Sequence, residues 1–168
     1  ILGPEMRSTG EVMGIDTDFG TAFAKAQLGA GQKLPQGGMV FVSVNDRDKA
    51  AIVPVIKDLL DLGFEVIATG GTRRALHEAG LKAVQLTLKV HEGRPNVRDA
   101  IVNGQVQLVI NTPIGKLAQY DDHEIRRTSI VYKVPIVTTI AGARATAAAI
   151  RALQGQPIAV KSLQEHLA

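Results

Sequence analysis

The sequence predicts an α/β fold: a three-layer α/β/α sandwich built on a five-stranded parallel sheet. Three observations predict it. From residue 39 onward, short apolar segments alternate with segments of helical periodicity. The apolar segments carry hydrophobic residues at both odd and even positions, as expected for strands that are covered on both faces. Polar residues follow each of them. Strands separated by helices in this way indicate parallel pairing through right-handed crossover connections.

Strands are expected where short β-branched or fully apolar runs are bounded by turn residues. These runs are residues 39–44, 64–68, 84–88, 106–110 and 136–140. A further edge strand is expected at residues 158–160.

Helices are expected where apolar residues recur at helical spacing behind a capping residue. Asp18 is a candidate N-cap for a helix through residue 28, and Asp46 or Asp48 for a helix that Gly63 ends. The acidic run at residues 121–124 suits the positive end of a helix dipole, so we expect a helix to begin there. The remaining helices are expected at residues 72–78, 97–102, 143–153 and 162–168.

The composition indicates one hydrophobic core and excludes several classes of function. The chain has 168 residues, 45% of them hydrophobic, which suffices for one domain with a small appendage. Its 19 basic and 16 acidic residues give a net charge of +3, and the basic residues are scattered. Only 4% of residues are aromatic, so a nucleic-acid partner is not expected. The absence of cysteine excludes disulfides and zinc–thiolate sites.

The chain shows no sign of a membrane span. No apolar stretch approaches the roughly 20 residues that cross a bilayer, so we expect a soluble, cytoplasmic protein without a membrane partner. Because the first residue is Ile1, we also expect the chain to be part of a longer protein. Residues 29–38 contain four glycines and a proline and are interpreted as a linker.

Residues 66–72, Val-Ile-Ala-Thr-Gly-Gly-Thr, are typical of a phosphate-binding turn between a strand and a helix. Gly70 and Gly71 let the backbone turn and let an anion approach the amides closely, and the helix start adds partial positive charge. Thr69 and Thr72 can add hydroxyl donors. Taken alone, two glycines at this position are more often ordinary turn chemistry.

Polar residues at the ends of the other strands favour the phosphate interpretation. In a parallel sheet these ends meet at one edge, near the switch in strand order. Lys49, Lys89, Asn111 and Thr112 all lie in such segments. Lysine charge combined with short hydroxyl and amide donors suits a phosphate group. Each residue also has a structural interpretation, as a solvated lysine or part of a strand-exit turn, so their shared location is the stronger argument.

No catalytic constellation or metal site emerges from the spacing. His91 precedes Glu92, which can serve acid/base chemistry, yet neither has a partner at a fixed spacing. The chain also lacks the HxH and HExxH patterns of metal ligands. We therefore expect the polar strand ends to bind an anion without reacting with it.

Several motifs, in order along nearly the whole chain, resemble the C-terminal end of the large subunit of carbamoyl phosphate synthetases. They are the segments at residues 3–14, 68–72, 89–95, 111–112 and 125–127. By this resemblance, residues 1–32 correspond to the tail of the preceding ATP-grasp synthetase half plus a linker. Residues 33–168 correspond to the allosteric, methylglyoxal-synthase-like domain, which implies the strand order 3-2-1-4-5.

The resemblance implies a regulatory domain. In the bacterial family this domain binds UMP, an inhibitor, and IMP, an activator, at one overlapping site, and supplies part of an ornithine site. The implied phosphate and nucleotide site consists of Lys49, Thr69, Gly70, Gly71, Thr72, Lys89, Asn111 and Thr112. Asp121 and Thr138 match the ornithine positions of this domain. Pro113 stands where some members have a second threonine, which removes a hydroxyl and an amide proton and bears on nucleotide preference.

For the parent enzyme, the resemblance implies a glutamine-hydrolysing, ATP-dependent ligase that forms carbamoyl phosphate for pyrimidine and arginine biosynthesis. The parent's cofactors are ATP, magnesium or manganese, and potassium, and none is expected in this part of it. The implied partners are the remainder of the large subunit, the small glutaminase subunit and, through this domain, further copies of the chain.

Two other families share single features with the chain. Methylglyoxal synthases, which are phosphate lyases, share the fold and bind a phosphate, but they need an aspartate where this chain has Arg94 or Pro95. The cyclohydrolase of purine synthesis shares the Gly-Gly-Thr turn but lacks the motif at residues 8–14. The expectation is therefore a non-catalytic domain, with a methylglyoxal-synthase-like lyase as the alternative.

Overall fold

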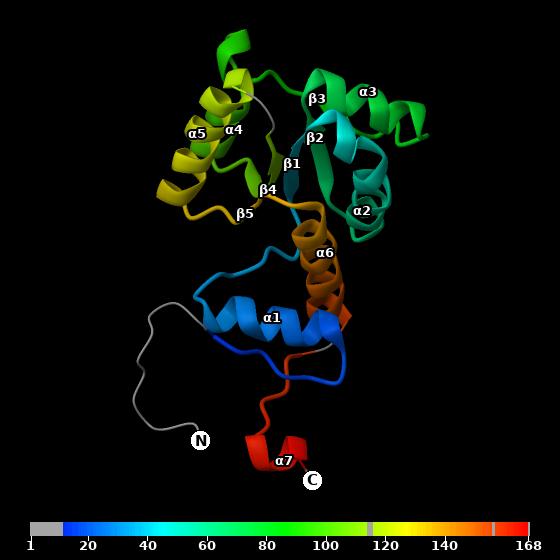
Figure 1. Ribbon diagram of the computed structural model, residues 1–168, viewed down its shortest axis with the longest axis vertical. Helices are drawn as coiled ribbons and strands as arrows, with labels where there is room; N and C mark the ends of the chain where they lie inside the picture. Colours follow the sequence, from blue (N-terminus) through cyan, green and yellow to red (C-terminus); the bar gives the residue numbers. More distant parts are fainter. Residues whose placement is uncertain (1–11, 114–115, 156, 168) are drawn as a thin grey trace.

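The computed structural model describes residues 12–113, 116–155 and 157–167 of the chain. Within these residues, a parallel sheet of five strands lies between two layers of helices, in the order β3-β2-β1-β4-β5 (Figure 1). The strands are β1 (Met39–Val44), β2 (Glu65–Ala68), β3 (Gln85–Leu86), β4 (Val106–Thr112) and β5 (Ile136–Val137). The predicted fold class and strand order are confirmed.

Helices cover both faces of the sheet. On one face lie α2 (Lys49–Asp61), α3 (Gly70–Glu78) and α6 (Ile140–Gly155), and on the other α4 (Val97–Val102) and α5 (Lys116–Val131). The remaining elements are the 3-10 turns η1 (Asp46–Asp48) and η2 (Val90–Glu92) and the terminal helices α1 (Phe19–Gly29) and α7 (Leu163–Leu167). None of the helices in the described ranges has the length and apolar character that a membrane span requires.

The central strand β1 explains why its segment is apolar at every position. Val40 and Val42 are fully buried among side chains of α2, α3 and α6. Phe41, between them, points to the opposite face and packs against Val97 and Ile101 of α4. Since alternate residues of a strand point to opposite faces, two covered faces require hydrophobic residues at both parities.

The parallel register brings the carboxyl ends of the central strands to one edge. Val42 of β1 lies opposite Ala68 of β2 and Ile110 of β4, and Ser43 lies opposite Asn111. The chain switches direction across the sheet between β1 and β4, because β2 and β3 lie on one side of β1 and β4 and β5 on the other. Ligands of such sheets bind outside the carboxyl ends at this switch.

Several predicted boundaries are wrong. Only two residues of β3 and of β5 pair with a neighbouring strand, so these strands are shorter than the predicted 84–88 and 136–140. Ile140 instead begins α6, which is longer than the predicted 143–153. Residues 158–160 add no strand to the sheet formed by the described residues, whose edges are β3 and β5.

The sequence predicted that the acidic run at residues 121–124 begins a helix, and this prediction is wrong. Helix α5 already begins at Lys116, which places the run inside it. The carboxylate of Asp122 accepts hydrogen bonds from Arg126 one turn later, at 3.0 and 3.1 Å. Acidic residues stabilise the start of a helix through the helix dipole, and they stabilise its middle through i,i+4 ion pairs. Their presence therefore does not by itself identify where a helix begins.

Helix α1 packs on α6, outside the sandwich (Figure 1). As predicted, Asp18 caps it, and the amide of Thr21 donates to Asp18 Oδ2 at 2.8 Å. Gly20 of α1 is buried, and a Cβ atom there would lie 2.7 Å from the backbone oxygen of Ala148. The close contact between α1 and α6 therefore requires glycine, which has no side chain, at position 20. The division at residue 32 stays a prediction, and residues 1–11 lie outside the described residues.

We expect Gly20→Ala to lower the free energy of unfolding by about 1–3 kcal/mol, because the new methyl group overlaps a backbone oxygen that cannot move alone. Urea denaturation followed by circular dichroism measures this. Gly29→Ala in the same helix is the matched control, since its Cβ would lie 3.5 Å from Val12, an ordinary contact. Equal stability of both variants would contradict the packing described.

Candidate functional site

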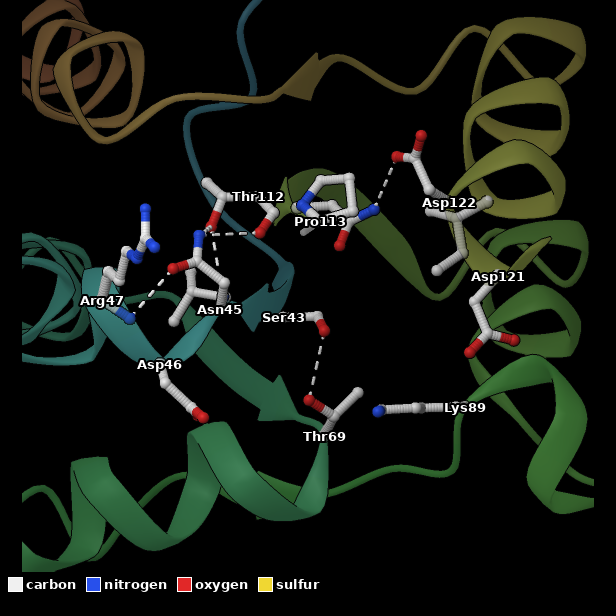
Figure 2. Close-up of a pocket in the computed structure, with 13 residues that line it drawn as sticks. Ser43, Asn45, Asp46, Arg47, Thr69, Lys89, Thr112, Pro113, Asp121 and Asp122 are labelled. Atoms are coloured by element: carbon white, nitrogen blue, oxygen red, sulfur yellow. Dashed lines mark hydrogen bonds between the residues drawn. The ribbon is translucent and has the colours of Figure 1, made fainter. Parts of the chain in front are cut away.

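A cavity of about 400 Å³ opens at the carboxyl edge of the sheet, around the switch point between β1 and β4 (Figure 2). Segments from both halves of the sheet and from α5 line it. They are residues 43–47 at the end of β1, Thr69 after β2, Lys89 after β3, residues 111–113 at the end of β4, and Asp121, Asp122 and Ile125 of α5. Hydroxyl, amide, ammonium and carboxylate groups therefore converge on one space.

Two threonines connect the start of α3 to the end of β1. The Thr69 hydroxyl bonds to Ser43 Oγ at 3.2 Å, and both residues face the cavity. Thr72, one turn later, is only 1% exposed, and its hydroxyl accepts the backbone N–H of Val44 at 3.0 Å. Thr72 therefore stabilises the β1–α3 junction beneath the cavity, whereas Thr69 presents its hydroxyl to the cavity itself.

Lys89 directs its ammonium group toward Thr69 across the cavity (Figure 2). Among the described residues it has no ion-pair partner. Its loop is held by its own hydrogen bonds: Glu92 accepts the backbone N–H of Lys89 at 2.8 Å, and Asn96 donates to the oxygens of Gly93 and Val90. The loop thus holds the backbone of Lys89 in place, while its ammonium group remains available to an anion.

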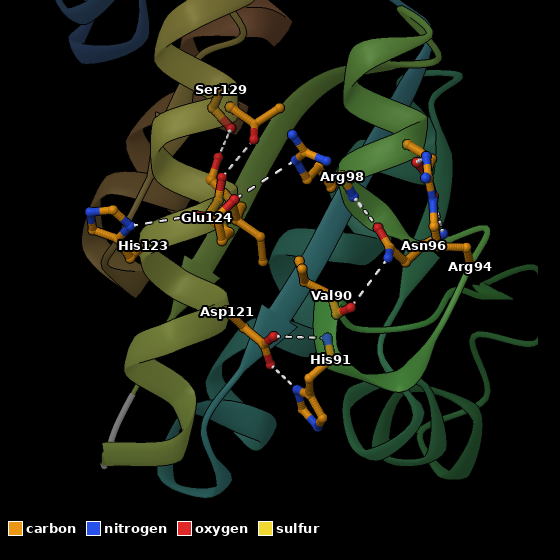
Figure 3. Close-up of polar contacts among 12 residues, drawn as sticks. Val90, His91, Arg94, Asn96, Arg98, Asp121, His123, Glu124 and Ser129 are labelled. Atoms are coloured by element: carbon orange, nitrogen blue, oxygen red, sulfur yellow. Dashed lines mark hydrogen bonds and ion pairs between the residues drawn. The ribbon is translucent and has the colours of Figure 1, made fainter.

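The candidate acid/base pair of His91 and Glu92, which the sequence did not favour, is not formed among the described residues. His91 contacts Asp121 of α5 instead, through its ring Nδ1 at 2.6 Å and its backbone N–H at 3.2 Å (Figure 3). The Asp121 side chain is 10% exposed and the His91 ring 53%. Both carboxylate oxygens of Asp121 accept a hydrogen bond from His91, so this contact ties the Lys89 loop to α5.

The far end of the same loop is tied down by charge. Arg94 forms an ion pair with Asp99 of α4, and the Asp99 carboxylate also accepts the backbone N–H of Asn96 at 3.0 Å. The hydrogen bond from Arg94 lowers the pKa of Asp99 below its usual value, and the hydrogen bond to Asp99 raises the pKa of Arg94. Residues 89–96 are therefore anchored at both ends, which favours a preformed site.

Lys49 does not line the cavity, although the sequence places it in the site. Its ammonium group pairs with Asp46 Oδ1 at 2.7 Å and lies near the first turn of α3, 3.4 Å from where a Cβ of Gly71 would be. Asp46 does line the cavity. The hydrogen bond from Lys49, with its positive charge, lowers the pKa of the Asp46 carboxyl.

Asn45 is a site residue that the sequence prediction missed. Its side-chain amide donates to Thr112 O at 3.0 Å, to Thr112 Oγ1 at 3.1 Å and to Asp48 Oδ2 at 2.6 Å. Its carbonyl oxygen accepts the backbone N–H of Arg47 at 2.9 Å. Asn45 thereby links the ends of β1 and β4 and orients the Thr112 hydroxyl. Its position directly after the first strand was a signal that could have identified it.

Asn111 also has a fixed orientation. Its side-chain amide donates to Asp122 Oδ1 at 3.0 Å, and Asp122 is held in turn by Arg126. Asn111 and Thr112 are both buried, at 4% exposure each. The cavity wall between β4 and α5 is therefore a hydrogen-bonded network.

The comparison with protein families agrees with this architecture. The model of the MGS-like domain family matches residues 51–138, from α2 through the end of β5. The chain belongs to the MGS-like domain family. Within the family's span lie Thr69, Lys89, Asn111 and Thr112, the predicted site residues that line the cavity.

Curated relatives of this MGS-like domain are carbamoyl phosphate synthase large chains. The chain is 64% identical to that of Nostoc sp. over 166 residues, which is 99% of this chain and 15% of the relative. It is 52% identical to the large chain of Archaeoglobus fulgidus, with 99% and 15% covered. It is 50% identical to the arginine-specific, chloroplastic large chain of Oryza sativa subsp. japonica, with 99% and 14% covered. The chain spans about one seventh of these relatives' length.

Of the remaining predicted positions, only Asp121 lines the cavity. Gly70 and Gly71 form the exposed first turn of α3, and Thr72 is buried beneath it. Of the two predicted ornithine positions, Asp121 lines the cavity and Thr138 is exposed after β5. No group of three or more metal-ligating side chains occurs among the residues for which the structure gives positions. Whether any predicted residue binds a ligand stays a prediction.

We expect Thr72→Val to lower the free energy of unfolding by about 1–3 kcal/mol, because it leaves the buried N–H of Val44 without its acceptor at nearly unchanged volume. Urea denaturation measures the change. Thr138→Val makes the same chemical change at an exposed position and should be close to neutral. A loss in the control as large as in Thr72→Val would show that the hydrogen bond is not the cause.

Proposed function

We propose that this MGS-like domain binds a nucleoside monophosphate in the cavity and thereby regulates carbamoyl phosphate synthesis by its parent enzyme. One observation carries the proposal. The Lys89 ammonium, unpaired among the described residues, faces the hydroxyls of Thr69 and Ser43 across a cavity large enough for a small ligand. A phosphate group between them would receive both charge and short hydrogen-bond donors.

The rest of the cavity suits the sugar and base of a nucleotide. Asp121 and Asp122 supply carboxylate oxygens on the α5 side, which can accept hydrogen bonds from ribose hydroxyls. Thr112 and Pro113 line the cavity at the end of β4, with Pro113 next to Asp122 (Figure 2). We propose UMP as inhibitor and IMP as activator at this single site, with Pro113 influencing the preference because it supplies neither hydroxyl nor amide proton.

The proposed parent is a glutamine-hydrolysing, ATP-dependent carbamoyl phosphate synthase of the cytoplasm that serves pyrimidine and arginine biosynthesis. The names of the relatives support the carbamoyl phosphate synthase part of this proposal, and the arginine-specific relative supports a link to arginine. ATP, magnesium or manganese, and potassium would bind elsewhere in the parent, and the proposed partners are the rest of the large subunit, the small glutaminase subunit and further copies of this domain. Asp121 and Thr138 would supply part of an ornithine site. Regulation requires that each effector bind two states of the parent with different affinity.

We expect Lys89→Ala to weaken UMP and IMP binding by about 1.5–3 kcal/mol, roughly tenfold or more, because a charge-assisted contact with the phosphate is lost. Isothermal titration calorimetry at fixed ionic strength measures both affinities. Lys82→Ala removes the same charge from an exposed loop position outside the cavity and should bind like the wild type. Equal affinities of wild type and Lys89→Ala would remove Lys89 from the site.

The alternative is a methylglyoxal-synthase-like lyase, and the buried Asp121 at the cavity edge is the observation that favours it. A proton-abstracting base needs a free carboxylate oxygen near the substrate. Each oxygen of Asp121 accepts a hydrogen bond from His91, which holds the carboxylate in one orientation and supports a binding role instead.

Incubation with dihydroxyacetone phosphate should therefore release no methylglyoxal or phosphate above the uncatalysed background, because Arg94 or Pro95 stands where methylglyoxal synthases need their aspartate. Colorimetric measurement of both products checks this. Release that disappears in Asp121→Asn would establish the lyase and overturn the regulatory proposal as the sole function.

A further inference from the structure

Lys49 lies outside the lining of the cavity and forms an ion pair with Asp46, which belongs to that lining. Lys49 Nζ lies 2.7 Å from Asp46 Oδ1, and the Lys49 side chain is 29% exposed. Asp46 is 92% exposed and lines the cavity, on its α3 side. A carboxylate that belongs to the lining of the proposed phosphate cavity therefore holds the ammonium group of a lysine that lies outside that lining.

The position of the pair matters for any anion in the cavity. Lys49 Nζ lies over the first turn of α3, next to Gly71, and Thr69 at the start of that turn faces the cavity. An anion against Thr69 would be attracted by Lys49 and repelled by Asp46. The i,i+3 spacing of the two residues across η1 and the start of α2 keeps them within reach of each other.

We propose that Asp46 is an internal competitor of the ligand's phosphate for the ammonium group of Lys49. This inference rests on the proposed function and adds a regulating residue to the same site. When the phosphate binds, Lys49 leaves Asp46 or is shared with the phosphate, and the affinity of the site is the difference between the two interactions. The lowered pKa of Asp46 agrees with a carboxylate that interacts with Lys49 in the free protein.

The strength of the exposed pair sets the size of the effect. Exposed ion pairs contribute little, because water screens them, so the competition is modest and a dianionic phosphate can overcome it. Removing the carboxylate frees Lys49 and also removes a repulsive charge. We therefore expect Asp46→Asn to tighten binding of UMP and of inorganic phosphate by roughly two- to tenfold.

The experiment compares four forms of the chain by calorimetry at fixed ionic strength: wild type, Asp46→Asn, Lys49→Met and the double variant. Competition predicts that Asp46→Asn binds UMP more tightly than wild type, that Lys49→Met binds more weakly, and that the gain from Asp46→Asn is clearly smaller in the Lys49→Met background. The difference between the two backgrounds measures the coupling of the pair.

Asp61→Asn is the matched control. It removes the same charge from an exposed i,i+4 pair with Lys57, at 2.8 Å, near the other end of α2. Its UMP affinity should equal that of the wild type. A gain as large as that of Asp46→Asn would show that net charge alone is responsible and would overturn the proposal.

Two further outcomes would overturn it. An unchanged or weaker affinity of Asp46→Asn for UMP means that Asp46 does not compete. A gain that persists in full in the Lys49→Met background means that Asp46 acts by repulsion without sequestering Lys49. In both cases the proposed function would still stand if the wild type binds UMP and Lys89→Ala loses this binding. Failure of the wild type to bind UMP, IMP or phosphate at all would overturn the proposed function as well.

Discussion

The parallel register of β1 against both β2 and β4 is the constraint on which the fold and the site both depend. It places Ser43 opposite Asn111 and Val44 opposite Thr112 at the end of the sheet. The same register directs Val42 to one core and Phe41 to the other. A slip of one residue would exchange the faces of every side chain in a strand, so the cavity wall could not shift without exposing the core.

The charges around the cavity are largely paired with one another before any ligand arrives. Asp121 bonds to His91, Asp122 to Arg126, and Lys49 to Asp46. Such pairs orient side chains and loops in advance, which reduces the conformational entropy that a ligand must remove on binding. Within the described residues Lys89 differs, because its backbone is anchored while its ammonium group has no partner. The site thus combines a rigid frame with available positive charge, since the guanidinium of Arg47, which also lines the cavity, likewise has no ion-pair partner among the described residues.

Local patterns in the sequence predicted what depends on local chemistry. Apolar residues at both parities identified β1, and the Gly-Gly turn with its threonines indicated a helix there, although α3 begins at Gly70 and not at the predicted residue 72. Contacts between distant segments could not be predicted: Asn45 meets Thr112 67 residues away, and His91 meets Asp121 30 residues away. The ion pair of Lys49 could have been predicted from the sequence, since Asp46 precedes Lys49 by three residues, a spacing that favours an ion pair.

Helix α6 links the two ends of the molecule mechanically. It begins at Ile140, just beyond β5 at the cavity edge of the sheet, and its 16 residues extend about 24 Å to the region where α1 lies across it. The contact at Gly20 is tight, so α1 has little freedom to slide against this helix. A small rotation of α6 about its end at the sheet would therefore move α1 as well, and the displacement would be larger at α1 because α1 lies far from that end.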